Sequence, residues 1–119
     1  MNFKDLYTIE QRTAESKKII NKYPGLCPVI LSISNDSIFR ATDIQSPDKF
    51  KYLVPNIQLS NFIFIIRRKL KVKEHTGLFF LINNSVIPLA SELMHVLYEK
   101  YKDPDGFLYL TVTSESVFG

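Results

Sequence analysis

Apolar and charged side chains alternate along residues 49–54, and this period of two is typical of a β-strand. One face of the strand carries three apolar side chains: Phe50, Tyr52 and Val54. The other face carries two lysines and a leucine: Lys49, Lys51 and Leu53. Pro55 ends the strand, because proline has no N–H group to donate to a sheet ladder.

The lysines of this strand favour a place at the edge of a sheet, where charge discourages unwanted pairing. A plain edge strand with solvated lysines would explain the pattern. An edge strand with apolar side chains on both faces can also accept an extended peptide, whose alternate side chains enter pockets on the two faces. Both interpretations follow from the same residues.

Apolar side chains spaced three and four residues apart predict two amphipathic helices. The main helix covers about residues 57–70, with five apolar residues on one side: Leu59, Phe62, Ile63, Ile66 and Leu70. The second helix is expected to begin at the cap Ser91 and to reach about residue 101. Its buried side is expected to hold four residues: Leu93, Met94, Leu97 and Tyr101.

A more polar helix is expected near the start of the chain. Thr8 and Gln11 match a capping box, and the sequence after Lys22 stops a helix. Because few of its residues are apolar, this helix should lie on the surface of the domain. A shorter helix is expected before Thr8.

Three further strands are expected at residues 27–34, 78–82 and 107–113. The apolar run at 78–82 predicts a strand that is covered on both faces. The order of helix, two strands, main helix, strand, short helix and strand predicts an α+β domain of the ubiquitin-like β-grasp type. Such a domain is a four-stranded mixed sheet with a crossing helix, preceded here by N-terminal helices.

Composition supports a single globular domain. The chain has 119 residues, of which 45% are hydrophobic and 23% charged, so wholesale disorder is not expected. No apolar run approaches the roughly 20 residues that span a bilayer, and the first residues lack a signal-peptide pattern. The single cysteine fits a reducing compartment, and the net charge of +3 favours acidic partners or anionic membrane surfaces.

The sequence offers little catalytic chemistry. His75 and His95 are the only histidines, and they are expected in different elements. Cys27 begins a strand, where a small buried hydrophobe is commoner than a reactive thiol; a cysteine hydrolase would need it exposed beside a base. No phosphate loop or metal-ligand spacing occurs, so we expect no enzyme, no metal and no cofactor.

The basic features of the chain have structural explanations. Arg67, Arg68, Lys69 and Lys71 cluster at the C-terminal end of the main helix, where they complement the helix dipole. Aromatic residues interleaved with lysines at 49–52 could stack on single-stranded nucleic acid, but no RNA-binding sheet signature accompanies them. We therefore expect no nucleic-acid partner.

Short motifs run in order along nearly the whole chain and in register with the expected elements. They occupy residues 22–24, 28–30, 51–55, 62–68, 78–80, 83–84, 97–98, 108–109 and 115–119. Each motif is weak alone, but together they are specific. The chain resembles the ubiquitin-like modifiers of autophagy, relatives of the light chain of microtubule-associated proteins and of GABA-receptor-associated protein.

The resemblance implies that Gly119 is joined to phosphatidylethanolamine by an activating and a conjugating enzyme. It implies a cytoplasmic protein that lies on the autophagosome membrane when lipidated, and a processing or delipidating cysteine protease as a further partner. The chain would divide into a helical extension (1–25), a β-grasp core (26–113) and a flexible conjugation tail (114–119). The alternative is a soluble, non-lipidated peptide-binding or microtubule-associated trafficking adaptor.

The resemblance also implies that cargo receptors bind through an aromatic-x-x-aliphatic motif with acidic flanks, added as a strand beside residues 51–54. The aromatic pocket would be lined by Glu15, Ile19, Pro28, Lys51, Leu53 and Phe107. The aliphatic pocket would be lined by Tyr52, Val54, Pro55, Phe62 and Ile65. Lys49 and Lys51 would attract the acidic flanks. Two departures affect partner choice: Leu26 stands where relatives often carry Arg, and the connection 38–48 is long.

Overall fold

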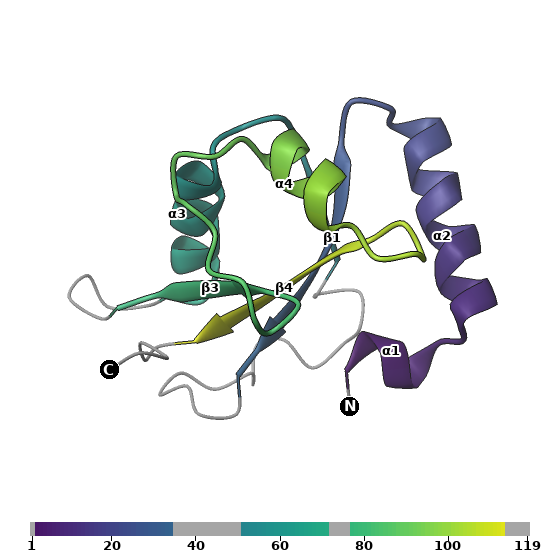
Figure 1. The fold of residues 1–119 in the computed structure, drawn as a ribbon, viewed down its shortest axis with the longest axis horizontal. Coiled ribbons are helices and arrows are strands. Elements are labelled where there is room, and N and C mark those ends of the chain that lie inside the picture. The colour runs from purple at the N-terminus through teal and green to yellow at the C-terminus, as the bar shows by residue number, and fades with distance from the viewer. Residues whose placement is uncertain (1, 35–50, 72–76, 114–119) are drawn as a thin grey trace.

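A four-stranded mixed sheet forms the centre of the computed structural model (Figure 1), which describes residues 2–34, 51–71 and 77–113. The strands follow the order β2-β1-β4-β3, and their bounds are β1 Cys27–Ile33, β2 Lys51–Val54, β3 Phe79–Ile82 and β4 Leu108–Thr113. The helices are α1 Phe3–Leu6, α2 Ile9–Lys22, α3 Leu59–Lys69 and α4 Met94–Tyr101. This arrangement confirms the predicted α+β class, the mixed sheet and the N-terminal helices.

The two central strands give the sheet its mixed character. β1 runs antiparallel to β2 and parallel to β4, while β4 runs antiparallel to β3. β2 and β3 therefore occupy the two edges of the sheet. The predicted edge position of residues 51–54 is confirmed, whereas Lys49 and Phe50 lie outside the described residues.

Helices cover both faces of the sheet, and Figure 1 shows α2 and α3 on opposite sides of it. On one face α3 and α4 bury the main core, in which Val29, Phe62 and Leu97 are almost fully enclosed. On the other face α1 and α2 bury a smaller cluster of Phe3, Ile19, Ile30 and Phe107. The domain thus has two apolar layers separated by one sheet.

Local signals define α2 as predicted. The Thr8 side chain accepts a hydrogen bond from the N–H of Gln11, and the Gln11 side chain accepts one from the N–H of Thr8. The same reciprocal cap joins Asn2 and Asp5 at the start of α1, which confirms the short first helix. Ile19 is the only apolar residue of α2 that is buried, so this helix lies on the surface of the sheet.

Three predictions at the other end of the chain were wrong. Strand β3 is not covered on both faces: Phe80 and Ile82 are buried, but Phe79 is 41% exposed because β3 lies at a sheet edge. Ser91 does not cap α4, whose N-cap position is held by Leu93 without any side-chain hydrogen bond. Leu93 is also largely exposed rather than buried.

Helix α3 is shorter than predicted. It begins at Leu59 rather than near residue 57, because the N–H of Leu59 bonds to the carbonyl of Glu92 and the carbonyl of Ile57 accepts from Met94. These long-range bonds hold the residues before α3 in an extended form. Within the described residues, no helix combines the length and apolar character needed to cross a bilayer.

Gly106 occupies a position that only glycine fits well. Its φ is +92°, and a Cβ atom there would overlap the hydroxyl of Ser16, which donates to the carbonyl of Asp105. We expect Gly106→Ala to lower the free energy of unfolding by about 1–3 kcal/mol, the usual cost of such backbone strain. Urea denaturation of the variant measures this.

Gly25→Ala is the matched control. No atom lies within 4 Å of a Cβ placed on Gly25, and its backbone is outside the left-handed region. The control should be neutral or slightly stabilising, because alanine restricts the unfolded chain more than glycine does. Equal effects of the two substitutions would contradict the role of Gly106.

Candidate functional site

The free edge of β2 is the feature around which the candidate site is built. β2 pairs with β1 through Pro28↔Leu53 and Ile30↔Lys51, and none of the described strands lies on its other side. Antiparallel partners alternate between hydrogen-bonded and non-hydrogen-bonded pairs, and Pro28 has no N–H to donate. The Pro28–Leu53 pair is therefore non-hydrogen-bonded, so the backbone groups of Leu53 and Lys51 point to the outer edge.

An ion pair closes the α2 side of this edge. The Nζ atom of Lys51 lies 2.8 Å from Oε1 of Glu15, which projects from α2. The hydrogen bond from Lys51 lowers the pKa of the Glu15 carboxyl below its usual value. Leu53, which shares this face of β2, is 37% exposed. The α2 side of the β2 edge therefore has a mouth, formed by the Lys51–Glu15 ion pair and the accessible apolar side chain of Leu53.

The floor beneath this mouth is apolar and aromatic. Ile19, Pro28 and Phe107 are all buried. The Phe3 ring packs edge-on against Phe107 with their centroids 5.4 Å apart. Phe3 and Ile30 complete the cluster, and sequence analysis assigned neither of them to the site. The capping box that begins at Asn2 was the available signal for an ordered Phe3.

The α3 side of the edge has a different character. Tyr52 packs edge-on against Phe62 with ring centroids 5.8 Å apart, and burial raises the pKa of the Tyr52 hydroxyl. Val54 and Phe62 are almost fully buried, whereas Ile65 on α3 is 41% exposed. Pro55 follows the strand and is exposed. This face thus presents apolar groups from both β2 and α3.

A buried polar network fastens the N-terminal helices to the loop before β4. Asp105 is fully buried, and its Oδ2 accepts hydrogen bonds from Arg12 Nη1 at 2.6 Å and from the Tyr109 hydroxyl at 2.5 Å. Its Oδ1 accepts from the N–H of Phe107 at 2.8 Å. Burial and the bond to Asp105 raise the pKa of Tyr109. The network holds the Phe107 backbone, and with it the floor of the α2 side.

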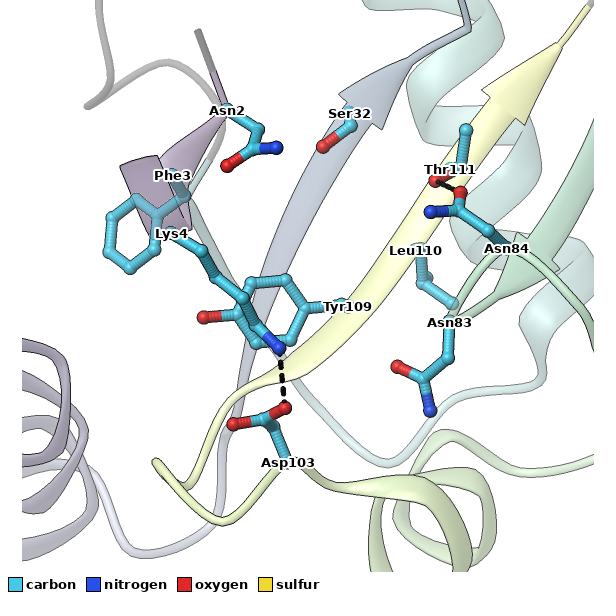
Figure 2. Close-up of a pocket in the computed structure, with 10 residues that line it drawn as sticks. All are labelled: Asn2, Phe3, Lys4, Ser32, Asn83, Asn84, Asp103, Tyr109, Leu110 and Thr111. Atoms are coloured by element: carbon cyan, nitrogen blue, oxygen red, sulfur yellow. Dashed lines mark hydrogen bonds and ion pairs between the residues drawn. The ribbon is translucent and has the colours of Figure 1, made fainter. Parts of the chain in front are cut away.

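Lys4 adds a second link beside this network, shown in Figure 2. Its Nζ atom bonds to Oδ1 of Asp103 at 2.7 Å and lies 4.6 Å from the centroid of the Tyr109 ring. Burial of the Asp103 carboxyl opposes ionisation, but the hydrogen bonds from Lys4 and from the N–H of Asp105, together with the charges of Lys4 and Arg12, outweigh burial and lower its pKa. Lys4 crosses one side of a pocket whose other side is formed by Asn83 and Asn84.

Comparison with known proteins identifies the family. The model of the family described as "Autophagy protein Atg8 ubiquitin like" matches residues 11–119. The chain belongs to the Atg8 family of ubiquitin-like proteins.

Relatives of this Atg8 protein match it over almost its whole length. It is 40% identical to autophagy-related protein 8i of Arabidopsis thaliana, covering 99% of this chain and 98% of the relative. It is 38% identical to autophagy-related protein 8 of Schizosaccharomyces pombe, covering 98% and 93%. The resemblance stated from the sequence motifs is therefore confirmed.

Solved Atg8 structures share the fold. The crystal structure of Trypanosoma brucei ATG8 matches with a TM-score of 0.85 and 28% identity, covering 100% of this chain and 98% of that one. Plasmodium falciparum Atg8 in complex with a Plasmodium falciparum Atg3 peptide matches with a TM-score of 0.84 and 32% identity, covering 98% of both chains. The predicted ubiquitin-like β-grasp with N-terminal helices is confirmed.

Of the other side chains considered for catalysis, Cys27 and His95 have structural roles, whereas His75 lies outside the described residues. Cys27 of this Atg8 protein is buried, and burial raises its pKa to about 11, so the reactive thiolate is disfavoured at neutral pH. A ring nitrogen of His95 lies 3.2 Å from the carbonyl of Gly25, which ties α4 to the loop before β1. Among the described residues, no group of histidine, cysteine and carboxylate side chains is placed to hold a metal ion.

The structure brings together most of the residues expected from the resemblance. Those expected on the aromatic side come from α2, β1, β2 and the residue just before β4, and they are Glu15, Ile19, Pro28, Lys51, Leu53 and Phe107. Those expected on the aliphatic side come from β2, the residue after it and α3, and they are Tyr52, Val54, Pro55, Phe62 and Ile65. Lys49, Gly119 and the long connection 38–48 lie outside the described residues.

Proposed function

We propose that this Atg8 protein is conjugated through Gly119 to phosphatidylethanolamine on autophagosomal membranes, where it recruits cargo receptors by peptide strand addition. The protein is then a substrate of an activating and a conjugating enzyme, and performs no catalysis itself. It is cytoplasmic before conjugation and membrane-bound afterwards. The family membership supports the role of modifier, and the site geometry supports the recruitment.

The free edge of β2 is the observation that carries the recruitment. An added peptide strand would bond to the outward backbone groups of Lys51 and Leu53. Because successive side chains of a strand point to opposite faces, its aromatic and aliphatic residues could enter opposite sides of β2. Leu53 and the buried floor around Phe107 would receive the aromatic residue, while Tyr52, Phe62 and Ile65 would receive the aliphatic one.

Positive charge at the edge of β2 supports the proposal that the bound motif has acidic flanking residues. Lys51 and, by sequence, Lys49 offer cations beside the added strand. Lys51 is paired with Glu15, so an acidic peptide must compete for it or approach it from the open side. Since charges at an interface rim act chiefly on association rate, we propose that these lysines steer the peptide more than they hold it.

The Plasmodium falciparum relative supports a conjugating enzyme as partner, because its structure contains an Atg3 peptide. We extend that partnership to this chain. A processing or delipidating cysteine protease would act on the same C-terminal tail. The alternative, a soluble adaptor that is never lipidated, would use the β2 edge alone.

The double substitution Tyr52→Ala with Leu53→Ala tests the recruitment. It removes side chains from both faces of β2, and we expect it to weaken binding of an acidic-flanked aromatic-x-x-aliphatic peptide by about 100-fold or more. Losses of this size follow when central anchors of an interface are truncated. Isothermal titration calorimetry with the wild-type chain and the variant measures the change.

Phe79→Ala with Leu81→Ala is the matched control, because it shortens side chains on one face of the opposite edge strand, β3. Peptide affinity should stay within about twofold of wild type in this control. Circular dichroism must show both variants folded. Unchanged affinity in the folded β2 variant would place the peptide elsewhere and remove the basis for the recruitment.

A further inference from the structure

We propose that the outer face of α3, formed by Phe64 and Arg68, is a contact surface for anionic phospholipid membranes, together with Lys71 just beyond the end of the helix. Phe64 and Arg68 are four positions apart within α3, which places both side chains on one face of the helix. Lys71 follows the C-cap Leu70 with a left-handed backbone, at φ 54°. The proposal concerns a surface separate from the β2 edge.

Burial separates the two sides of α3 sharply. Leu59, Phe62 and Ile66 are each almost fully buried against the sheet. Phe64 lies on the opposite side and is 59% exposed. The guanidinium of Arg68 lies 5.9 Å from the centroid of the Phe64 ring, within range of a cation–π contact. The Phe64 ring is thus exposed to solvent, with the Arg68 cation beside it.

The charge of α3 has a single sign. The helix contains no acidic residue, and its last turn holds Arg67, Arg68 and Lys69, with Lys71 following. Among the described residues, neither Arg68 nor Lys71 forms an ion pair with a carboxylate. Cations at a helix C-terminus complement the helix dipole, which accounts for their position. The helix dipole does not account for the exposed Phe64 ring beside Arg68.

An anionic membrane fits this combination better than a nucleic acid does. In helices that lie in the membrane interface, aromatic side chains enter the acyl boundary while basic side chains of the same helix meet acidic headgroups, and the Phe64 ring with Arg68 one turn later offers both. Platforms for single-stranded nucleic acid stack successive bases on several aromatic rings. The outer face of α3 offers one such ring.

The position of α3 suits membrane contact if Gly119 is the attachment point, a step that rests on the proposed function. Figure 1 shows α3 on the same side of the molecule as the end of β4, with α2 on the far side. Thr113, the last residue of β4, pairs with Phe79 at the start of β3. Gly119 lies six residues beyond Thr113, a chain length that spans at most about 20 Å. A lipid joined there would keep the outer face of α3 near the bilayer.

Phe64→Trp tests the surface directly, because the chain contains no tryptophan and the substituted residue would be its sole indole fluorophore. The full, unconjugated chain is mixed with vesicles of phosphatidylcholine containing phosphatidylserine, or of phosphatidylcholine alone. We expect a blue shift of the emission and quenching by brominated acyl chains with the anionic vesicles only. Adding Arg68→Gln should weaken the partition by roughly fivefold, the usual effect of losing one interfacial cation.

Ile20→Trp on α2 is the matched control, because Ile20 is also partly exposed but lies on the far helix. Its emission should not shift with either vesicle. The proposal is overturned if Phe64→Trp gives no shift, if both tryptophans respond equally, or if Phe64→Trp responds to polyuridylate and not to vesicles. Since the chain is unconjugated, failure here leaves attachment at Gly119 intact, and failure of that attachment leaves this result intact.

Discussion

Deleting Gly119 is expected to abolish recovery of the protein on membranes while leaving its fold and peptide binding unchanged. Glycine lacks a Cβ atom, so a terminal glycine can pass through a narrow enzyme channel that a bulkier residue would block. Joining its carboxyl group to a two-chain lipid would anchor the domain stably, because two acyl chains exceed the marginal membrane binding of one. Intact-mass analysis of protein recovered from cell membranes measures the attachment.

Val117→Ala is the control for this deletion, because it shortens a side chain of the same tail and keeps the terminal glycine. The control should still carry the added mass of the lipid. The modifier function would fail if the deletion variant also carried that mass, or stayed on membranes as before. The soluble adaptor would then replace it.

Replacing the buried Asp105 is expected to lower the free energy of unfolding by several kcal/mol. Asp105→Ala leaves the Arg12 guanidinium without its closest carboxylate and removes the acceptor for the N–H of Phe107 and the hydroxyl of Tyr109. Removing one partner of a buried ion pair typically costs 3–5 kcal/mol, and we expect about 3–5 kcal/mol here. Urea denaturation followed by circular dichroism measures the loss.

Glu99→Ala is the matched control, since Glu99 pairs with Lys102 at 3.4 Å on the exposed surface. Such surface pairs contribute little to stability, so the control should be close to neutral. Pairing Asp105→Ala with Arg12→Met gives a double-mutant cycle that isolates their interaction. If the double variant lost the sum of the two single effects, Arg12 and Asp105 would not be coupled as their distance implies.

Local signals in the sequence were sufficient for some elements. The capping box of Thr8 and Gln11 defines where α2 begins, because both hydrogen bonds lie within one turn. The alternation of Lys51, Tyr52, Leu53 and Val54 likewise assigns their faces, because the period of a strand is fixed by its backbone.

Long-range pairing decided what the local pattern could not. The apolar run of β3 suggested a strand covered on both faces, yet its edge position leaves Phe79 exposed. Helix α3 starts at Leu59 rather than near residue 57, because the carbonyl of Ile57 accepts a hydrogen bond from the N–H of Met94 instead of one from within a helix. The hydrophobic periodicity of a single segment does not predict which strands become its neighbours in the sheet.

The exposed residues of the candidate site could be predicted from the sequence, but the buried residues that support them could not. The residues of β2 follow from alternation, and the resemblance supplies their neighbours on α2 and α3. The support behind them comes from Phe3 and Asp105, which lie at opposite ends of the sequence: Phe3 packs against the Phe107 ring, and Asp105 accepts a hydrogen bond from the Phe107 N–H. Asp105 lies among residues 103–106, whose proline, glycine and aspartates are typical of a turn, and a turn sequence does not indicate that one of its charges is buried.

The pairing of β1 with β4 has a consequence for synthesis of the chain on the ribosome. β1 is central in the sheet, but its parallel neighbour β4 is the last of the described strands to be made. Phe3 and Ile19 must likewise wait for Phe107 before their side of the sheet can close. The nascent chain therefore carries uncovered apolar surface until β4 has been made, and we expect chaperones to bind it through the α2 and β1 segments.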